Sequence, residues 1–352
     1  MSERPRRKPT AKKPERKNAR SVLGRRRPIP TVESRRSADW PEALESSAGE
    51  GFSWSAAFGH QPVLLAETLD ALNVKPDGFY VDATLGGGGH SRAILERLDP
   101  DGRLLALDLD EEPLAWARAW SGDDQRFIVR RLNFARLPEC LAELGLGPAD
   151  GLLADLGLNS RQISASTRGF SFSREGPLDM RLDRSAPLTA AEVVNQSSEE
   201  VLADLFFRFG EERAARRLAR AIVEAREEDP IETTVRLAEI AERTLGFQKD
   251  KSRLHPATKM FMSLRLKVNG EMDSLERFLG SARSCLKTGG RLAVISFHSL
   301  EDRMVKLALR DGESAGDCPW RLWRRKAIKP GVAELLANPR ARSARLRAAE
   351  AV

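Results

Sequence analysis

Four consecutive glycines, Gly86 to Gly89, follow a strand-like apolar segment and precede a helical pattern. Glycine at such a turn permits positive φ and carries no Cβ, so backbone N–H groups and the helix N-terminus can approach a ligand closely. The next strand pattern, residues 103–108, ends in Asp108. A carboxylate at about this spacing binds ribose hydroxyls in nucleotide-binding folds. The sequence therefore predicts a nucleotide-type cofactor site.

The charges around this loop favour S-adenosylmethionine over a dinucleotide. Asp82 precedes the loop, and Asp108 is followed by Asp110. Carboxylates there repel the pyrophosphate that a G-x-G-x-x-G loop holds, whereas S-adenosylmethionine carries a positive sulfonium and no phosphate. We therefore favour a methyltransferase. An NAD(P)-binding oxidoreductase and a glycine turn without a ligand are the alternatives.

Strand and helix patterns alternate in the first half of the chain. Strand-like runs lie at residues 79–84, 103–108, 126–131 and 151–157. Such alternation indicates a parallel sheet with right-handed crossovers. The later elements are a helical region from about 187 to 246, a helical stretch at 257–286, a strand at 290–297, a basic loop-like segment at 311–342 and a last edge strand at 344–350.

These patterns predict an α/β, Rossmann-like fold of the class I methyltransferase type, with a mostly parallel sheet interrupted by an inserted all-helical subdomain. The capping-box spacing of Thr189 and Glu192 opens the first inserted helix. The expected segments are a basic arm and linker (1–58), a first methyltransferase part (59–160), the inserted substrate-recognition subdomain (161–250) and a second methyltransferase part (251–352).

The positive charge of the chain is concentrated at its start. The formal net charge is +7, yet residues 1–40 hold 14 Lys and Arg against 4 Asp and Glu. Interleaved prolines and the lack of apolar periodicity predict a disordered arm. Such an arm can tether a polyanion by releasing counterions, and a merely solubilising extension is the alternative.

Composition argues against several other classes of protein. No apolar run approaches membrane-spanning length, so we expect no membrane contact and a cytoplasmic protein, or one of a mitochondrial or plastid matrix if the source has organelles. The three cysteines are far apart, which disfavours a disulfide framework. The four histidines lack ligand spacing, so no metal site is expected.

Six blocks, in order from about residue 59 to the C-terminus, carry a resemblance to one family. They read GHQPVLL (59–65), DATLGGGGHS (82–91), RGFSF with GPLDMR (168–181), HPAT (255–258), FHSLEDR (297–303) and NPRARS (338–343). The chain resembles the ribosomal RNA small-subunit methyltransferase H family. The resemblance implies an enzyme that methylates the exocyclic N4 of a cytidine in the decoding region of 16S ribosomal RNA, with S-adenosylmethionine as donor.

The resemblance also implies cofactor contacts along the carboxyl edge of the sheet. They fall on Gly86, Gly88, Gly89, His90, Asp108, Phe134, Asp155 and Gln162. Asp108 can accept hydrogen bonds from both ribose hydroxyls, and the ring of Phe134 can pack on adenine; an ordinary core position is the alternative for Phe134. The segment 159–162 lacks the proline usual in the family, which leaves the geometry near Gln162 open.

The chemistry of N4 methylation requires a proton acceptor, because the nitrogen lone pair is delocalised into the ring and the amine must lose a proton. Amino methyltransferases acting on DNA supply that acceptor from a segment after the fourth strand. Asp155 and Asn159 occupy that place here. We predict that Asp155, with Asn159 or a backbone carbonyl, is the acceptor; in the alternative, Asp155 only holds the methionine end of the cofactor.

The cytidine must leave its stack to reach the methyl group, and stacking rings and cations hold such a base. The candidate substrate-binding residues are Arg168, Phe170, Phe172, Arg181 and His298. In the alternative, the two phenylalanines only pack the insertion. The expected partner is 16S rRNA or the small ribosomal subunit; the oligomeric state stays open, with a dimer among the options. A non-enzymatic RNA-binding protein remains the second alternative.

Overall fold

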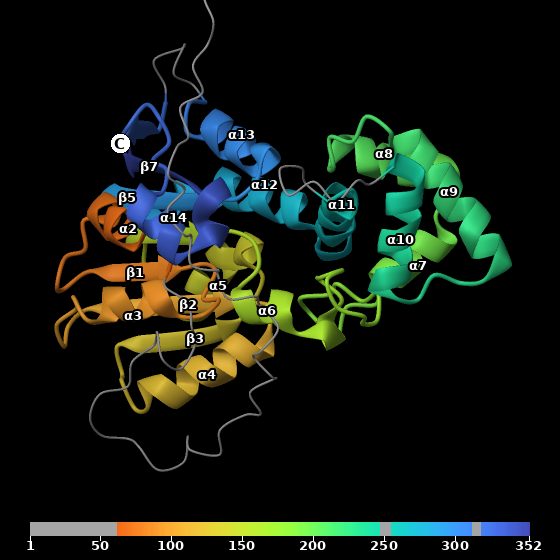
Figure 1. Ribbon diagram of the computed structural model, residues 1–352. Coiled ribbons are helices and arrows are strands. Elements are labelled where there is room, and N and C mark those ends of the chain that lie inside the picture. Colours follow the sequence, from red (N-terminus) through yellow and green to blue (C-terminus); the bar gives the residue numbers. More distant parts are fainter. Residues whose placement is uncertain (1–61, 247–254, 312–317) are drawn as a thin grey trace, which may run out of the picture. The chain divides into compact units, whose positions relative to one another are not determined.

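A seven-stranded sheet forms the centre of the computed structural model, which describes residues 62–246, 255–311 and 318–352. The described residues belong to one compact unit of the chain. Figure 1 shows β1, β2 and β3 side by side, and β5 next to β7. The strands, in spatial order, are β3 (Phe127–Arg131), β2 (Arg103–Asp108), β1 (Phe79–Asp82), β4 (Ala149–Asp155), β5 (Leu286–Ser296), β7 (Arg345–Ala351) and β6 (Trp320–Leu322).

The first five strands are parallel, and β7 runs antiparallel to both of its neighbours. This mostly parallel sheet, with its helices, confirms the predicted Rossmann-like fold. Because the parallel strands share one direction, Asp82, Asp108 and Asp155 all lie at the carboxyl edge. Ligands of such sheets bind at that edge.

The central strands are apolar because both of their faces are covered. In β4, Leu152 and Ala154 belong to the core on one face, and Leu153 belongs to the core on the other. Side chains alternate between the two faces of a strand, so a strand buried on both sides reads as a continuous apolar run. This is why the sequence pattern predicted this strand, although β4 begins and ends two residues earlier than the expected 151–157.

Helices cover the two faces of the sheet. The face with Leu153 packs against α2 (Leu65–Leu72), α3 (Gly89–Leu95) and α14 (Val332–Ala337), and α4 (Glu111–Ser121) packs on β2 and β3. The face with Leu152 packs against α5 (Leu137–Glu143), α12 (Glu271–Ala282) and α13 (Ser299–Ala308).

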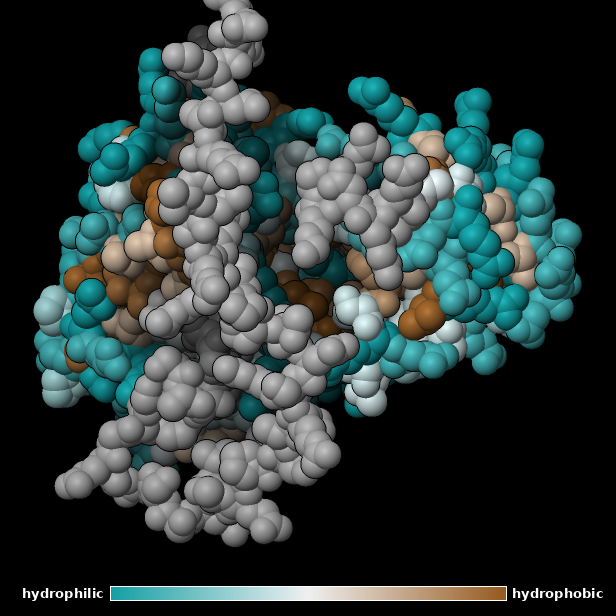
Figure 2. Space-filling model, in the orientation of Figure 1, coloured by the Kyte–Doolittle hydropathy of each residue, from teal (hydrophilic) through white to brown (hydrophobic). Residues whose placement is uncertain are grey.

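Five further helices share a second hydrophobic core. They are α7 (Ala190–Gln196), α8 (Glu199–Arg208), α9 (Ala215–Glu228), α10 (Thr234–Leu245) and α11 (Ala257–Asn269). The capping box of Thr189 and Glu192 opens α7 as predicted. Figure 2 shows mostly hydrophilic side chains on the visible faces of α8 and α9, as amphipathic helices with one buried stripe require.

The predicted division into four segments stays a prediction. Its boundaries at 58/59 and 250/251 lie outside the described residues, as does the whole basic arm. Within the described part, the second core includes Met260, Phe261 and Leu264 of α11. Helix α11 belongs to the expected second methyltransferase part (251–352). The helical core therefore contains residues of that part as well as of the expected inserted subdomain (161–250).

Three local expectations were wrong. The helical stretch 257–286 is interrupted at Gly270, which has φ 57° and separates α11 from α12. The strand expected at 344–350 exists as β7, but it lies between β5 and β6 rather than at the edge. The edge strand is β6, in a segment expected to be loop-like; three residues are too few to show the alternation that identifies a strand.

Candidate functional site

The glycine loop between β1 and α3 needs its glycines for two different reasons. Gly86 and Gly88 have φ of 51° and 76°, in the left-handed region where an L side chain is strained. A Cβ on Gly89 would lie 2.3 Å from the Pro62 ring, so close packing excludes a side chain there. A Cβ on Gly87 would meet no atom of the described residues within 4 Å. The loop therefore has an open side against which a ligand can lie.

Asp108 at the end of β2 is tied to this loop. Its Oδ2 accepts a hydrogen bond of 2.9 Å from the Gly86 N–H, and its Oδ1 accepts one of 2.9 Å from the Asp110 N–H. Burial raises the pKa of Asp108 to about 6, even though both N–H donors favour the charged form. The structure thus brings together two of the predicted cofactor residues.

Phe134 begins the short 3₁₀ helix η2 (Phe134–Arg136), which follows β3. The Leu132 N–H donates to the Asp108 carbonyl at 3.0 Å, which holds the segment leading to Phe134 beside β2. The half-buried ring of Phe134 meets Phe278 edge-on, with centroids 5.4 Å apart. The contact with adenine stays a prediction.

Asp82, at the end of β1, is a buried carboxyl that the sequence analysis treated only as a charge beside the loop. The Ser91 hydroxyl donates to its Oδ2 at 2.6 Å, and the Thr84 N–H donates to its Oδ1 at 3.2 Å. Burial raises the pKa of Asp82 to about 6 against these two hydrogen bonds. Asp82 thereby joins the strand end, the loop and the first turn of α3.

Asp155, at the end of β4, has spare hydrogen-bonding capacity. Its Oδ1 is buried and has no hydrogen-bond partner among the described residues, and its Oδ2 lies 3.5 Å from His90 Nδ1. The other ring nitrogen of His90 lies 3.1 Å from the Val63 carbonyl. Burial, followed by the charges of Asp82 and Glu301, holds the pKa of Asp155 well above its ordinary value.

Asn159 and Gln162 cap the start of a short helix that follows β4. Asn159 caps α6 (Ser160–Ser164): its Oδ1 accepts from the Gln162 N–H at 2.9 Å, and the Gln162 Oε1 accepts from the Asn159 N–H at 3.0 Å. This capping box orders the segment without the proline usual in the family. The Asn159 Nδ2 is buried and has no hydrogen-bond partner among the residues described.

Asp110 joins elements that are far apart in the sequence. It caps α4, and its Oδ2 accepts from the Gln162 Nε2 at 2.9 Å and from the Arg168 Nη1 at 2.7 Å. The Arg168 guanidinium is buried and also donates to the carbonyls of Arg181 and Leu182. Sequence reasoning missed this role, because a carboxylate and its partners more than 50 residues away share no local signal.

The candidate substrate residues of the 168–181 segment all have intramolecular contacts. Arg181 forms a bidentate pair with Asp179, with both N–O distances 2.8 Å. Phe170 belongs to the second core, and Phe172 stacks on His255 with centroids 4.5 Å apart. The contacts of Phe170 and Phe172 are the packing role that the sequence analysis kept as the alternative for these two residues. Direct contact with substrate stays a prediction for each of them.

His298 and Glu301 lie where β5 leaves the carboxyl edge. His298 caps α13 by accepting from the Glu301 N–H at 3.3 Å, and the Glu301 Oε2 accepts from the Phe297 N–H at 2.8 Å. Glu301 is buried, which would raise its pKa, but His298 and Arg265 hold that pKa below its ordinary value. In the sheet, β4 lies between β1, which leads into the glycine loop, and β5, which leads to His298.

The carboxyl edge thus presents, in sheet order, Asp108 on β2, the glycine loop on β1, Asp155 on β4 and His298 after β5. Among the described residues, no group of three His, Cys, Asp or Glu side chains is placed to hold a metal ion. In the same part of the chain, no helix has the length and apolar character needed to cross a membrane.

Comparisons with known proteins match most of the chain to one family. Residues 57–352 match the model of the MraW methylase family. A protein of Syntrophobacter fumaroxidans named "Ribosomal RNA small subunit methyltransferase H" is 48% identical over 308 residues, which cover 84% of this chain and 97% of that protein. A protein of the same name from Nitrosospira multiformis is 46% identical over 309 residues, covering 83% of this chain and 97% of that protein.

Solved structures resemble the chain more distantly. TrmN from Thermus thermophilus aligns with a TM-score of 0.40 and 14% identity, over 82% of this chain and 48% of that chain. A putative methyltransferase from Streptococcus mutans, solved in complex with SAH, aligns with a TM-score of 0.39 and 10% identity, over 83% of this chain and 100% of that chain.

Proposed function

The chain belongs to the MraW methylase family, and from that premise we propose that it transfers a methyl group from S-adenosylmethionine to the exocyclic N4 of one cytidine in the decoding region of 16S rRNA. The printed names of its relatives support small-subunit rRNA as the substrate. Family membership favours methyl transfer over an NAD(P)-dependent oxidoreductase and over an RNA-binding protein without catalysis. On this proposal the chain works in the cytoplasm.

The residues at the carboxyl edge fit the donor. The open side of Gly87 can receive a ligand, and two buried polar atoms, Asp155 Oδ1 and Asn159 Nδ2, lack partners within the described ranges. We assign the glycine loop, Asp108 and Phe134 to the adenosine part, and the region of Asp155 and Asn159 to the methionine part. When bound, S-adenosylmethionine supplies an electrophilic methyl group on a positive sulfonium.

The proposal rests mainly on the Asp155 carboxyl, which is buried with one unpartnered oxygen among the described residues and has a raised pKa. Because N4 must lose a proton, catalysis needs an acceptor within hydrogen-bond reach of the amine. The Asp155 carboxyl has an oxygen without a partner in the described part of the chain, and its raised pKa makes it a better base than an ordinary Asp. The Asn159 Oδ1 accepts from the Gln162 N–H, and an amide oxygen is too weak a base to take up the proton, so we assign that role to the Asp155 carboxylate.

Holding the reactants is the second task of these residues. In-line placement of nitrogen, methyl carbon and sulfur removes orientational entropy from the barrier. The hydrogen bonds of Asp82 and Asp108 fix the loop against β1 and β2, and the capping box of α6 fixes the segment after β4. A rigid edge of this kind holds the donor in one place while the base enters.

The test uses small ribosomal subunits that lack the modification, incubated with the full chain and methyl-labelled S-adenosylmethionine. Nucleoside analysis of the 16S rRNA is expected to place the label on N4 of a single cytidine. Label on another atom or another base would overturn the assignment of N4. Binding of the subunit with no transfer of label would support the non-enzymatic alternative.

A further inference from the structure

A basic pocket opens where β5 and β7 meet the start of α13. Its volume is about 240 Å³, and it is lined by Phe297, His298, Ser299, Lys329, Arg342, Ser343, Ala344 and Arg345. These residues come from the end of β5, the first residue of α13 and the segment 342–345 that enters β7, and Lys329 comes from the segment between β6 and α14. The pocket therefore lies at the same carboxyl edge as Asp155, on the side of β4 opposite to the glycine loop.

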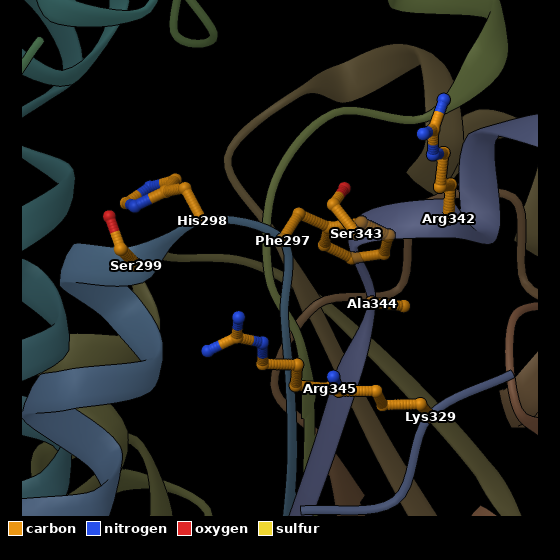
Figure 3. Close-up of a pocket in the computed structure, with 8 residues that line it drawn as sticks. All are labelled: Phe297, His298, Ser299, Lys329, Arg342, Ser343, Ala344 and Arg345. Carbon is orange, nitrogen blue, oxygen red and sulfur yellow. The ribbon is translucent and has the colours of Figure 1, made fainter. Parts of the chain in front are cut away.

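The pocket carries more positive charge than its neighbours neutralise. The Arg345 Nη1 lies 2.7 Å from Asp302 Oδ2, but Asp302 is shared with Arg347, whose Nε lies 2.7 Å from Oδ1. Lys329 and Arg342 form no ion pair with any residue that the structure describes. Figure 3 shows Lys329 extending toward Arg345, and Arg342 extending away from both.

Two carboxylates, Glu301 and Glu211, contact residues that line the pocket, but neither pairs with Lys329, Arg342 or Arg345, and Glu211 lies 3.5 Å from the Arg303 guanidinium. Glu301 contacts His298 and receives the Phe297 N–H, and Glu211 accepts from the Ser299 hydroxyl at 2.9 Å. In addition, Ser299 is the first residue of the ten-residue helix α13. Its N–H is one of the groups that have no partner within a helix, and the helix dipole favours an anion there. The pocket thus combines a helix N-terminus, a half-neutralised Arg345 and two cations that form no ion pair within the described ranges.

The register of β4 and β5 places the pocket about as far from Asp155 as a base is from its own backbone phosphate. Asp155 pairs with Ile295 across β4 and β5, and His298 follows three residues later. Neighbouring strands lie about 5 Å apart and a strand rises about 3.3 Å per residue, so the pocket begins on the order of 10 Å from Asp155. A nucleotide bridges a separation of this size between its base and its own backbone phosphate.

We propose that the pocket of Lys329, Arg342 and Arg345 binds a backbone phosphate of the RNA, next to the nucleotide whose base reaches Asp155. The inference rests on the proposed function and adds an anchor that neither the family nor the names of relatives specify. An extruded base is held at its edge and face by the protein, and a phosphate anchor beside it fixes where the strand enters.

The test compares Lys329→Ala, Arg342→Ala and the double variant with Arg103→Ala. Arg103 is an exposed arginine at the start of β2, on the opposite edge of the sheet, and serves as the matched control. Arg345 is left intact because it holds Asp302. Each variant is measured for methyl transfer to unmodified small subunits, for S-adenosylmethionine affinity by calorimetry, and for RNA binding over a range of salt concentrations.

We expect each single variant to raise the KM for the subunit roughly threefold to tenfold, with kcat and S-adenosylmethionine affinity unchanged. The slope of log affinity for RNA against log salt should fall by about 1 for each cation removed. Lys329→Arg should restore both quantities, and the Arg103 variant should match the wild type.

Variants that match the Arg103 control in KM and in salt slope would overturn the phosphate assignment, and so would a loss of S-adenosylmethionine affinity without a change in RNA binding. Failure of the proposed function looks different. In that case the wild type itself places no label on cytidine N4, while the salt slopes of the wild type and the variants still report whether the pocket binds phosphate.

Discussion

Replacing Asp155 by Asn removes the proposed proton acceptor and keeps the shape of the side chain. The amide is uncharged and nearly equal in volume, so the packing at the end of β4 should persist. A positioned proton acceptor contributes on the order of 10²–10⁴-fold to rate. We therefore expect Asp155→Asn to lower kcat about 100-fold or more, while the affinity for S-adenosylmethionine changes only a few-fold.

The same variant should stabilise the folded protein. Burial and the charges of Asp82 and Glu301 raise the pKa of Asp155 above its value in an unfolded chain. A carboxyl with a raised pKa contributes most to stability below its unfolded pKa, and this contribution is lost as pH rises through the folded pKa. At neutral pH the uncharged amide avoids that loss, so the midpoint of thermal unfolding should rise.

The assay is single-turnover transfer of labelled methyl groups to unmodified small subunits, with the donor affinity measured by calorimetry on the same preparation. In the wild type, the single-turnover rate should fall as pH decreases through the raised pKa of Asp155, and the Asn variant should lack that dependence. Near-normal turnover in Asp155→Asn would refute the acceptor role. A loss of turnover matched by a loss of donor binding would assign Asp155 to cofactor binding alone.

Three further predictions concern the scaffold of the site. Gly88→Ala places an L side chain at φ 76°, at a cost of about 1–2 kcal/mol; S-adenosylmethionine affinity should fall in calorimetry, and an unchanged Kd would contradict the loop assignment. Arg168→Ala leaves Asp110 buried and unpaired, so the free energy of unfolding in urea should fall by about 3–5 kcal/mol; a loss below 1 kcal/mol would contradict this. Because burial raises the pKa values of Asp82 and Asp108 to about 6, the stability that they contribute is fully present only below their unfolded pKa of about 4 and is lost as pH rises through 6; Asp82→Asn should flatten this dependence in urea titrations between pH 4 and pH 7.

Local signals predicted much of the fold. The buried strand β4 reads as an apolar run because both faces are covered, and the capping box of Thr189 and Glu192 marks the start of α7. The break at Gly270 was missed, although the pair Asn269-Gly270 is a typical helix stop. The short strand β6 gives no periodic signal, because its pairing with β7 is decided by tertiary contacts.

The site residues at the ends of strands could be predicted from the sequence, but the hydrogen bonds that join distant segments at the site could not. Asp108 and Asp155 follow apolar runs, so their shared edge could be inferred from topology. Asp110 was visible only as a charge, since its bonds to Gln162 and Arg168 arise from chain segments that meet only after folding. The burial of Arg168 was likewise not predictable, because an arginine beside phenylalanines resembles an RNA-binding surface.

The most direct test of the central claim is a crystal structure of the full chain with S-adenosylhomocysteine and an RNA fragment containing the target cytidine. The account predicts the thioether ligand against the glycine loop, its ribose at Asp108, and the cytidine N4 within hydrogen-bond distance of the Asp155 carboxyl. A ligand bound away from the loop, or a cytidine whose N4 does not reach Asp155, would contradict it.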